Sequence, residues 1–141
     1  MADGLKNMIR VNEFSVDKKR RNLGELLKLM GDLEQRQQDL ETEVANEQRI
    51  ASSLPGEADL YYGAYAGTVI DRRERIAESI KQMEVKVATA RDEMGEAYIE
   101  LKKYEIAKKN RDKKEALDES RREQSILDEI GLNAHRRKKH S

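Results

Sequence analysis

The sequence predicts an all-α protein: a long antiparallel two-helix coiled-coil hairpin with a turn near Pro55-Gly56 and a C-terminal helical overhang. Three observations lead to this prediction. Charged residues make up 40% of the 141 residues and aromatic residues only 4%, which is too little apolar volume for a conventional globular core. The 28 basic and 28 acidic residues balance, whereas disordered chains usually carry a high net charge. The apolar residues recur at heptad spacing on both sides of the only proline.

The first predicted helix covers about residues 5–54. Alternating steps of three and four residues trace one unbroken seam along it, and eleven of its fifteen positions are apolar. Such a sustained heptad pattern is typical of a coiled coil. The seam consists of Leu5, Ile9, Asn12, Val16, Lys19, Leu23, Leu26, Met30, Leu33, Gln37, Leu40, Val44, Glu47, Ala51 and Leu54.

A turn is expected at residues 55–59, because a helix tends to stop before a proline and Gly56 allows the backbone to reverse. The second predicted helix covers about residues 60–130, and twelve of the thirteen seam positions traced in it are apolar. Two heptad helices joined by a short turn fold back as an antiparallel pair. The second seam consists of Tyr62, Ala66, Val69, Arg73, Ile76, Ile80, Met83, Val87, Ala90, Met94, Ala97, Leu101 and Tyr104.

The register of the hairpin follows from pairing Leu54 with Tyr62, which brings Lys19 opposite Ala97. Residues beyond about 112 then have no partner in the first helix. The second seam also becomes entirely charged there, and an apolar stripe reappears only in another register, at Ala116, Leu127 and Ile130. We therefore expect one hairpin domain over residues 1–141, ending in an unpaired overhang and a basic tail at 131–141.

The net charge of zero is the sum over segments that carry different net charges. Residues 1–54 carry −1, residues 55–101 carry −4 and residues 102–141 carry +5. The C-terminal segment alternates further, with +5 over residues 102–114, −4 over 115–130 and +4 over 136–139. This pattern is typical either of a solvated helix end with a disordered basic terminus or of a segment that docks in an oppositely charged pore or groove.

No catalytic constellation is found. The chain has no cysteine, which excludes disulfides and thiolate chemistry, and its two histidines, His135 and His140, lie in the basic tail without flanking carboxylates. Gly63 and Gly67 are not followed by the Lys-Ser/Thr of a phosphate-binding loop. We therefore expect no enzymatic activity, no cofactor and no metal. No run of 18 apolar residues is present, and we expect a cytoplasmic protein without a signal peptide.

Three of the five tyrosines follow the predicted turn, at positions 61, 62 and 65. Only Tyr62 belongs to the seam. The other two either wrap the turn or contact a partner, since tyrosine is favoured at protein interfaces.

The pattern resembles the FliJ family, the coiled-coil stalk proteins of flagellar type III export, over nearly the whole chain. The resemblance depends on the order and spacing of several features outside the heptads. These are Arg21-Asn22-Leu23-Gly24-Glu25-Leu26, Asn46-Glu47-Gln48-Arg49, Tyr62-Gly63-Ala64-Tyr65 with Val69, and Asp128-Glu129-Ile130 with Ala134 and Arg136.

The resemblance implies a non-enzymatic component of the export apparatus, acting in flagellum biogenesis and thereby in motility and chemotaxis. Its partners would be a hexameric export ATPase, a transmembrane export gate protein and export chaperones, with peripheral membrane association through those partners and no nucleic acid. The implied contacts with the ATPase ring are Arg21, Lys108, Lys109, Arg111, Lys113, Lys114, Arg136 and Arg137.

The implied contact with the export gate falls on Val44, Gln48, Tyr65 and Val69. This chain departs from the family pattern at three of these positions. Family members often have aromatic residues where Val44 and Gln48 stand, and a larger residue where Val69 stands. The heptad register also places Val44 and Val69 in the seam, so Tyr65 is the best candidate for the contact.

Three other classes of protein fit parts of the sequence. A nucleic-acid-associated protein would act through the basic tail, and its binding would depend steeply on salt. A transcript-cleavage type of factor would use Glu57 and Asp59 at the hairpin tip to hold a metal, although such factors also carry a globular domain. A homo-oligomeric coiled-coil scaffold is the third alternative.

Overall fold

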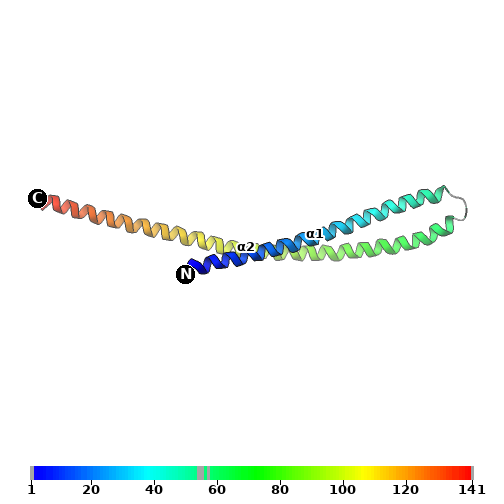
Figure 1. Ribbon diagram of the computed structural model, residues 1–141, viewed down its shortest axis with the longest axis horizontal. Helices are drawn as coiled ribbons and strands as arrows, with labels where there is room; N and C mark the ends of the chain where they lie inside the picture. The colour runs from blue at the N-terminus through cyan, green and yellow to red at the C-terminus, as the bar shows by residue number, and fades with distance from the viewer. Residues whose placement is uncertain (1, 54–55, 57, 141) are drawn as a thin grey trace. The chain divides into compact units, whose positions relative to one another are not determined.

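The computed structural model describes residues 2–53, 56 and 58–140, with the side chains of residues 4–53, 56 and 61–139. The chain forms two helices, α1 over Ala2–Ser52 and α2 over Ala58–His140 (Figure 1). No strand occurs among the residues that the structure describes. The prediction of an all-α helical hairpin is confirmed.

The C-terminal helix is longer than the sequence suggested. α2 continues through the expected basic tail to His140, ten residues past the expected end at residue 130. Its last segment contains no proline, and its Ala, Arg and Lys residues have a high helix propensity. Positive charges near a helix C-terminus also interact favourably with the helix dipole. The expectation of a separate tail at 131–141 is therefore corrected for residues 131–140.

The turn begins where serine hydroxyls cap α1. Ser52 Oγ donates to the Arg49 carbonyl at 2.8 Å, and Ser53 Oγ donates to the Ile50 carbonyl at 2.7 Å. Gly56 has a φ of +58°, a left-handed conformation that glycine adopts without steric cost. Pro55 and the expected pairing partner Leu54 lie outside the described residues.

The chain divides into two compact units, residues 15–97 and residues 1–14 with 98–141. Each is described by itself. That residues 1–141 form a single hairpin domain stays a prediction.

In the unit of residues 15–97, α1 and α2 pack antiparallel along the two predicted seams. Leu40, Val44 and Val69 form a core cluster in which each side chain is at most 7% exposed, and Tyr65 and Ile76 pack against it. The other buried residues of this unit also occupy predicted seam positions, which confirms the heptad assignment here. They are Val16, Val87 and Ala90.

Two polar seam positions in this unit behave differently. Gln37 and Arg73 are exposed, and Arg73 reaches across to Glu41 with two hydrogen bonds of 2.6 and 2.8 Å. Farther along, Lys19 Nζ lies 3.1 Å from the carboxylate of Glu93, one helical turn from the Ala97 expected opposite it. The charged side chains at these positions therefore lie at the edges of the seam, where they form ion pairs between the two helices.

In the other unit, the start of α1 lies beside α2 where Ile9 and Lys108 line one groove, and Leu101 of α2 is 7% exposed. The packing ends soon afterwards. Every described side chain from Asp112 to residue 139 is exposed, and the orange-to-red end of α2 has no second helix beside it (Figure 1). The predicted overhang is thus confirmed, and it is a continuous helix. No helix in the described part of the chain is both long and apolar enough to cross a bilayer.

Candidate interaction surfaces

The first candidate surface is a tyrosine patch formed by Glu43, Tyr62, Tyr65 and Arg72, near the turn. Tyr65 Oη donates a hydrogen bond of 3.0 Å to Glu43 Oε2, and Arg72 Nη1 donates one of 2.7 Å to the same oxygen. The rings of Tyr62 and Tyr65 lie 6.2 Å apart at an angle of 48°, a tilted aromatic pair. Residues of both helices thus hold the Tyr65 ring in one position.

The electrostatics of the patch are coupled. The hydrogen bond from Arg72, and after it that from Tyr65, lowers the pKa of Glu43. Partial burial, followed by the bond to Glu43, raises the pKa of Tyr65. At neutral pH Glu43 is therefore an anion and Tyr65 keeps the proton that it donates.

The four residues implied in the gate contact do not share one exposed surface. Val44 and Val69 are 7% and 3% exposed and belong to the hydrophobic core, as their seam positions indicated. Gln48 is exposed and Tyr65 is half-buried. Tyr61, also near the turn, is 69% exposed. In this conformation a partner can reach Gln48, Tyr61 and the outer part of Tyr65, and Tyr65 packs against the core cluster that contains the two valines.

The stability of this hairpin should fall as the pH drops below 4.5, the ordinary glutamate pKa. Hydrogen bonds from Arg73 and Arg72 lower the pKa of Glu41 and Glu43 in the folded protein. Each charged carboxylate therefore stabilises the folded state fully above its unfolded pKa, and this contribution is lost as the pH falls through the lower folded value. Thermal melts followed by circular dichroism should show the fall.

The double variant Glu41→Gln/Glu43→Gln should lose less Tm on acidification than the unmodified chain. The matched control is Glu34→Gln/Glu74→Gln, because both residues are exposed and have no ion pair within the described part of the chain. An acid-induced fall of equal size in the two double variants would contradict the prediction.

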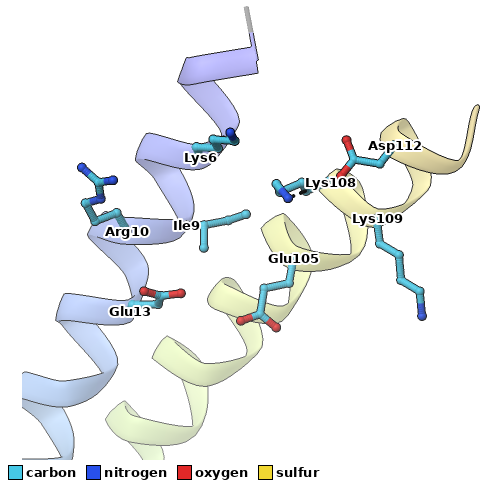
Figure 2. Close-up of a pocket in the computed structure, with 8 residues that line it drawn as sticks. All are labelled: Lys6, Ile9, Arg10, Glu13, Glu105, Lys108, Lys109 and Asp112. Carbon is cyan, nitrogen blue, oxygen red and sulfur yellow. Dashed lines mark hydrogen bonds and ion pairs between the residues drawn. The ribbon is translucent and has the colours of Figure 1, made fainter. Parts of the chain in front are cut away.

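The second candidate surface is an end groove of about 640 Å³ between the start of α1 and α2, within the unit of residues 1–14 and 98–141. Figure 2 shows Ile9 and Lys108 pointing toward each other across it, while Arg10 and Lys109 point outward. Lys108 Nζ lies 3.3 Å from Asp112 Oδ2. The groove is lined by Lys6, Ile9, Arg10, Glu13, Glu105, Lys108, Lys109 and Asp112.

The basic residues implied in the ring contact fall in three places. Five of them follow one stretch of α2 beside and beyond the end groove: Lys108, Lys109, Arg111, Lys113 and Lys114. Arg136 and Arg137 are exposed near the end of α2, about 33 Å farther along the helix at about 1.5 Å per residue. Arg21 belongs to the other unit, where it lines a separate hollow on α1.

Arg111 is held more tightly than its basic neighbours. Its Nη2 lies 3.3 Å from Asp112 Oδ1 and its Nε lies 3.9 Å from Glu115 Oε1. The Nε atom is buried and has no hydrogen-bond partner among the described residues. By contrast, Lys113 and Lys114 have no ion pair in the described part of the chain and are exposed. These two lysines are therefore the more available to a partner.

Sequence reasoning missed two groups of residues. Glu43 and Arg72 were not identified as partners of Tyr65, although they flank the seams on opposite helices at nearly paired positions. Lys6 and Arg10, on the α1 side of the end groove, were not named individually, although they lie in the stretch from about Leu5 to Arg21 that the family resemblance implied for the ring contact. The signal that could have found both groups is the hairpin register, applied to positions beside the seam and not only within it.

A search for metal-ligating side chains finds no group of three His, Cys, Asp or Glu close enough to hold a metal ion among the residues that the structure describes. The acidic residues of the hairpin are instead distributed along the helices, several of them in ion pairs with lysine or arginine.

Comparison with known proteins adds one finding. The family model described as the flagellar FliJ protein matches residues 1–140. No curated protein and no solved structure matches the chain. The match spans both helices, including the tyrosine patch, the end groove and the overhang. The chain therefore belongs to the FliJ family, non-catalytic coiled-coil components of the flagellar export apparatus.

Proposed function

We propose that this protein is the stalk of the flagellar export ATPase, without enzymatic activity of its own. The overhang and the basic residues around the end groove insert in the ring of the hexameric ATPase and promote its assembly and activity. The tyrosine patch contacts the transmembrane export gate, and export chaperones bind the same stalk. The protein thus acts in the cytoplasm, at the inner face of the cell membrane.

One observation carries the ring assignment: α2 continues as a helix beyond Asp112 with every described side chain exposed. A helix without a packed face is stabilised mainly when a partner covers it. Lys113, Arg136 and Arg137 supply positive charge along it, which favours a negatively charged pore.

A helix also contacts the successive subunits of a ring differently, because it has no sixfold symmetry. By binding some subunit conformations better than others, it shifts their populations and can couple nucleotide states around the ring. This is how a stalk without a catalytic site changes the rate of hydrolysis.

The triple variant Lys113→Glu/Arg136→Glu/Arg137→Glu should reduce the stimulation of ATP hydrolysis by about tenfold or more at low ionic strength, since it reverses the charge presented to the pore. The measurement is the hydrolysis rate of the purified ATPase with increasing amounts of the chain. The control Lys28→Glu/Lys81→Glu/Arg91→Glu makes the same change in net charge on exposed residues of the other unit. Unchanged stimulation by the first variant would show that the overhang does not dock in the ring.

Replacing Tyr65 with alanine should weaken binding to the cytoplasmic part of the export gate by about tenfold or more, as for a central interface tyrosine. Tyr65→Phe should retain most of the binding if the ring makes the contact, because only the bond to Glu43 is lost. Tyr98→Ala is the control, since Tyr98 is a half-exposed tyrosine of the other unit. Titration calorimetry against the isolated gate domain measures the three affinities, and equal losses at Tyr65 and Tyr98 would contradict the assignment.

A further inference from the structure

The overhang carries a third heptad seam that no residue of α1 covers. Starting at Ala116, alternating steps of four and three residues trace this overhang seam to the end of α2. At its centre Leu127 is 61% and Ile130 is 58% exposed, and the neighbouring Ile126 is 57% exposed. The overhang seam consists of Ala116, Ser120, Glu123, Leu127, Ile130, Ala134 and Arg137.

The order of charges along this seam distinguishes the possible orientations of a second helix. Glu123 lies on the N-terminal side of the apolar centre, and Arg137 lies on its C-terminal side. The surrounding segments share these signs, with −4 over residues 115–130 and +4 over residues 136–139. A parallel pair of identical helices would bring like charges opposite each other, whereas an antiparallel pair brings opposite charges together.

We propose that the overhang seam binds the same seam of a second copy of this chain, as an antiparallel helix pair. In the register that centres the pair between Leu127 and Ile130, Leu127 of each copy packs on Ile130 of the other. Ala134 then comes opposite Glu123 of the second copy, and Arg137 comes opposite Ser120. The two-fold axis repeats each of these contacts.

Charge complementarity favours a second, antiparallel copy of the chain as the partner of this seam. Arg137 lies one turn from Ala134 on the seam, so its guanidinium reaches the carboxylate of Glu123 in the second copy. The symmetry forms this ion pair twice, on either side of the apolar centre. In this antiparallel register the small residues Ala134 and Ser120 face the two charged seam residues and leave room for their side chains.

The interface has few apolar layers, so the dimer should be weak, dependent on concentration and sensitive to salt. It also covers Arg137, one of the residues proposed to dock in the ATPase ring. Dimerisation and ring docking would therefore exclude each other, and the free dimer would keep the overhang covered until a ring displaces the second copy. The dimer does not depend on the proposed function, because its test needs only the chain itself.

The first experiment measures the mass of the full chain by sedimentation equilibrium over a wide range of concentrations. The average mass should rise from 16.3 kDa toward twice that value and should fall back when salt is added. Leu127→Lys should remain monomeric throughout, with the helix content unchanged because Leu127 has no packing partner in the monomer. A chain that stays monomeric at every concentration would overturn the proposal.

The second experiment tests the orientation by charge exchange. Glu123→Arg and Arg137→Glu should each lose the dimer, because each places two like-charged pairs in the antiparallel interface. An equimolar mixture of the two variants should recover it, since the heterodimer contains two pairs of opposite charge. A parallel dimer sets residue 123 opposite residue 123, so the unmodified pair and both single variants would all place like charges opposite each other. A parallel dimer would therefore not be lost in the single variants, although the mixture would strengthen it, and loss of the dimer in each single variant is the result that identifies the antiparallel orientation.

Arg136→Glu is the matched control, because Arg136 is a neighbour that is also exposed and lies off the seam. It should leave the monomer–dimer equilibrium close to that of the unmodified chain. Failure of the mixture to recover the dimer, or equal losses for Arg136→Glu and Arg137→Glu, would overturn the proposed register.

Discussion

Replacing Leu40 with alanine is expected to destabilise the hairpin of residues 15–97 by about 2–5 kcal/mol, the usual range for a buried leucine. Leu40 is 2% exposed and packs in one cluster with Val44 and Val69. The cavity left by the truncation cannot be filled cheaply, because the cluster belongs to a two-helix interface with few other buried side chains. Since small domains are stable by only about 5–15 kcal/mol, the loss is a large share of the total.

The measurement is chemical denaturation followed by circular dichroism, with Leu29→Ala as the matched control. Leu29 is a leucine of the same helix that is 49% exposed and lies off the seam. Its truncation should change the free energy of unfolding by about 0.5 kcal/mol or less, as for most surface substitutions. Similar effects at Leu40 and Leu29 would mean that the heptad seam does not form the core of this hairpin.

The heptad seams could be predicted because periodicity is a property of the sequence itself. Leu40, Val69 and Val87 recur at seam spacing, and a helix places such residues on one face regardless of what surrounds it. The polar residues at seam positions were also visible in the sequence, but the contacts that they form were not. Arg73 turns away from the core and bonds to Glu41 on the opposite helix. This pairing depends on the lengths of both side chains and on the position of the opposite helix, and the heptad pattern of one helix contains neither.

In the tyrosine patch, too, the position of a residue could be predicted from the sequence but its contacts could not. The clustering of Tyr62 and Tyr65 after the turn was plain in the sequence, and so was the seam position of Val44. The partners of Tyr65 were not, because Glu43 is 22 residues away and the register must be known to within one turn to bring them together. Composition also misled at the other end, where a basic segment was expected to leave the helix although its residues have a high helix propensity.

Removal of residues 116–141 should abolish the stimulation of the export ATPase while leaving the melting temperature of the hairpin almost unchanged. The described side chains of this segment are all exposed, so its loss uncovers no core residue, and a cut after Glu115 preserves the ion pair between Arg111 and Glu115. Thermal melts by circular dichroism should show the same midpoint with less total helix. If the shortened chain instead melted much earlier, the overhang would be part of the folded core. If it stimulated hydrolysis normally, the ring would have to bind the stalk elsewhere. The two readouts are independent of each other. A retained midpoint with lost stimulation would therefore show that the overhang acts on the ATPase and that the hairpin is stable without it.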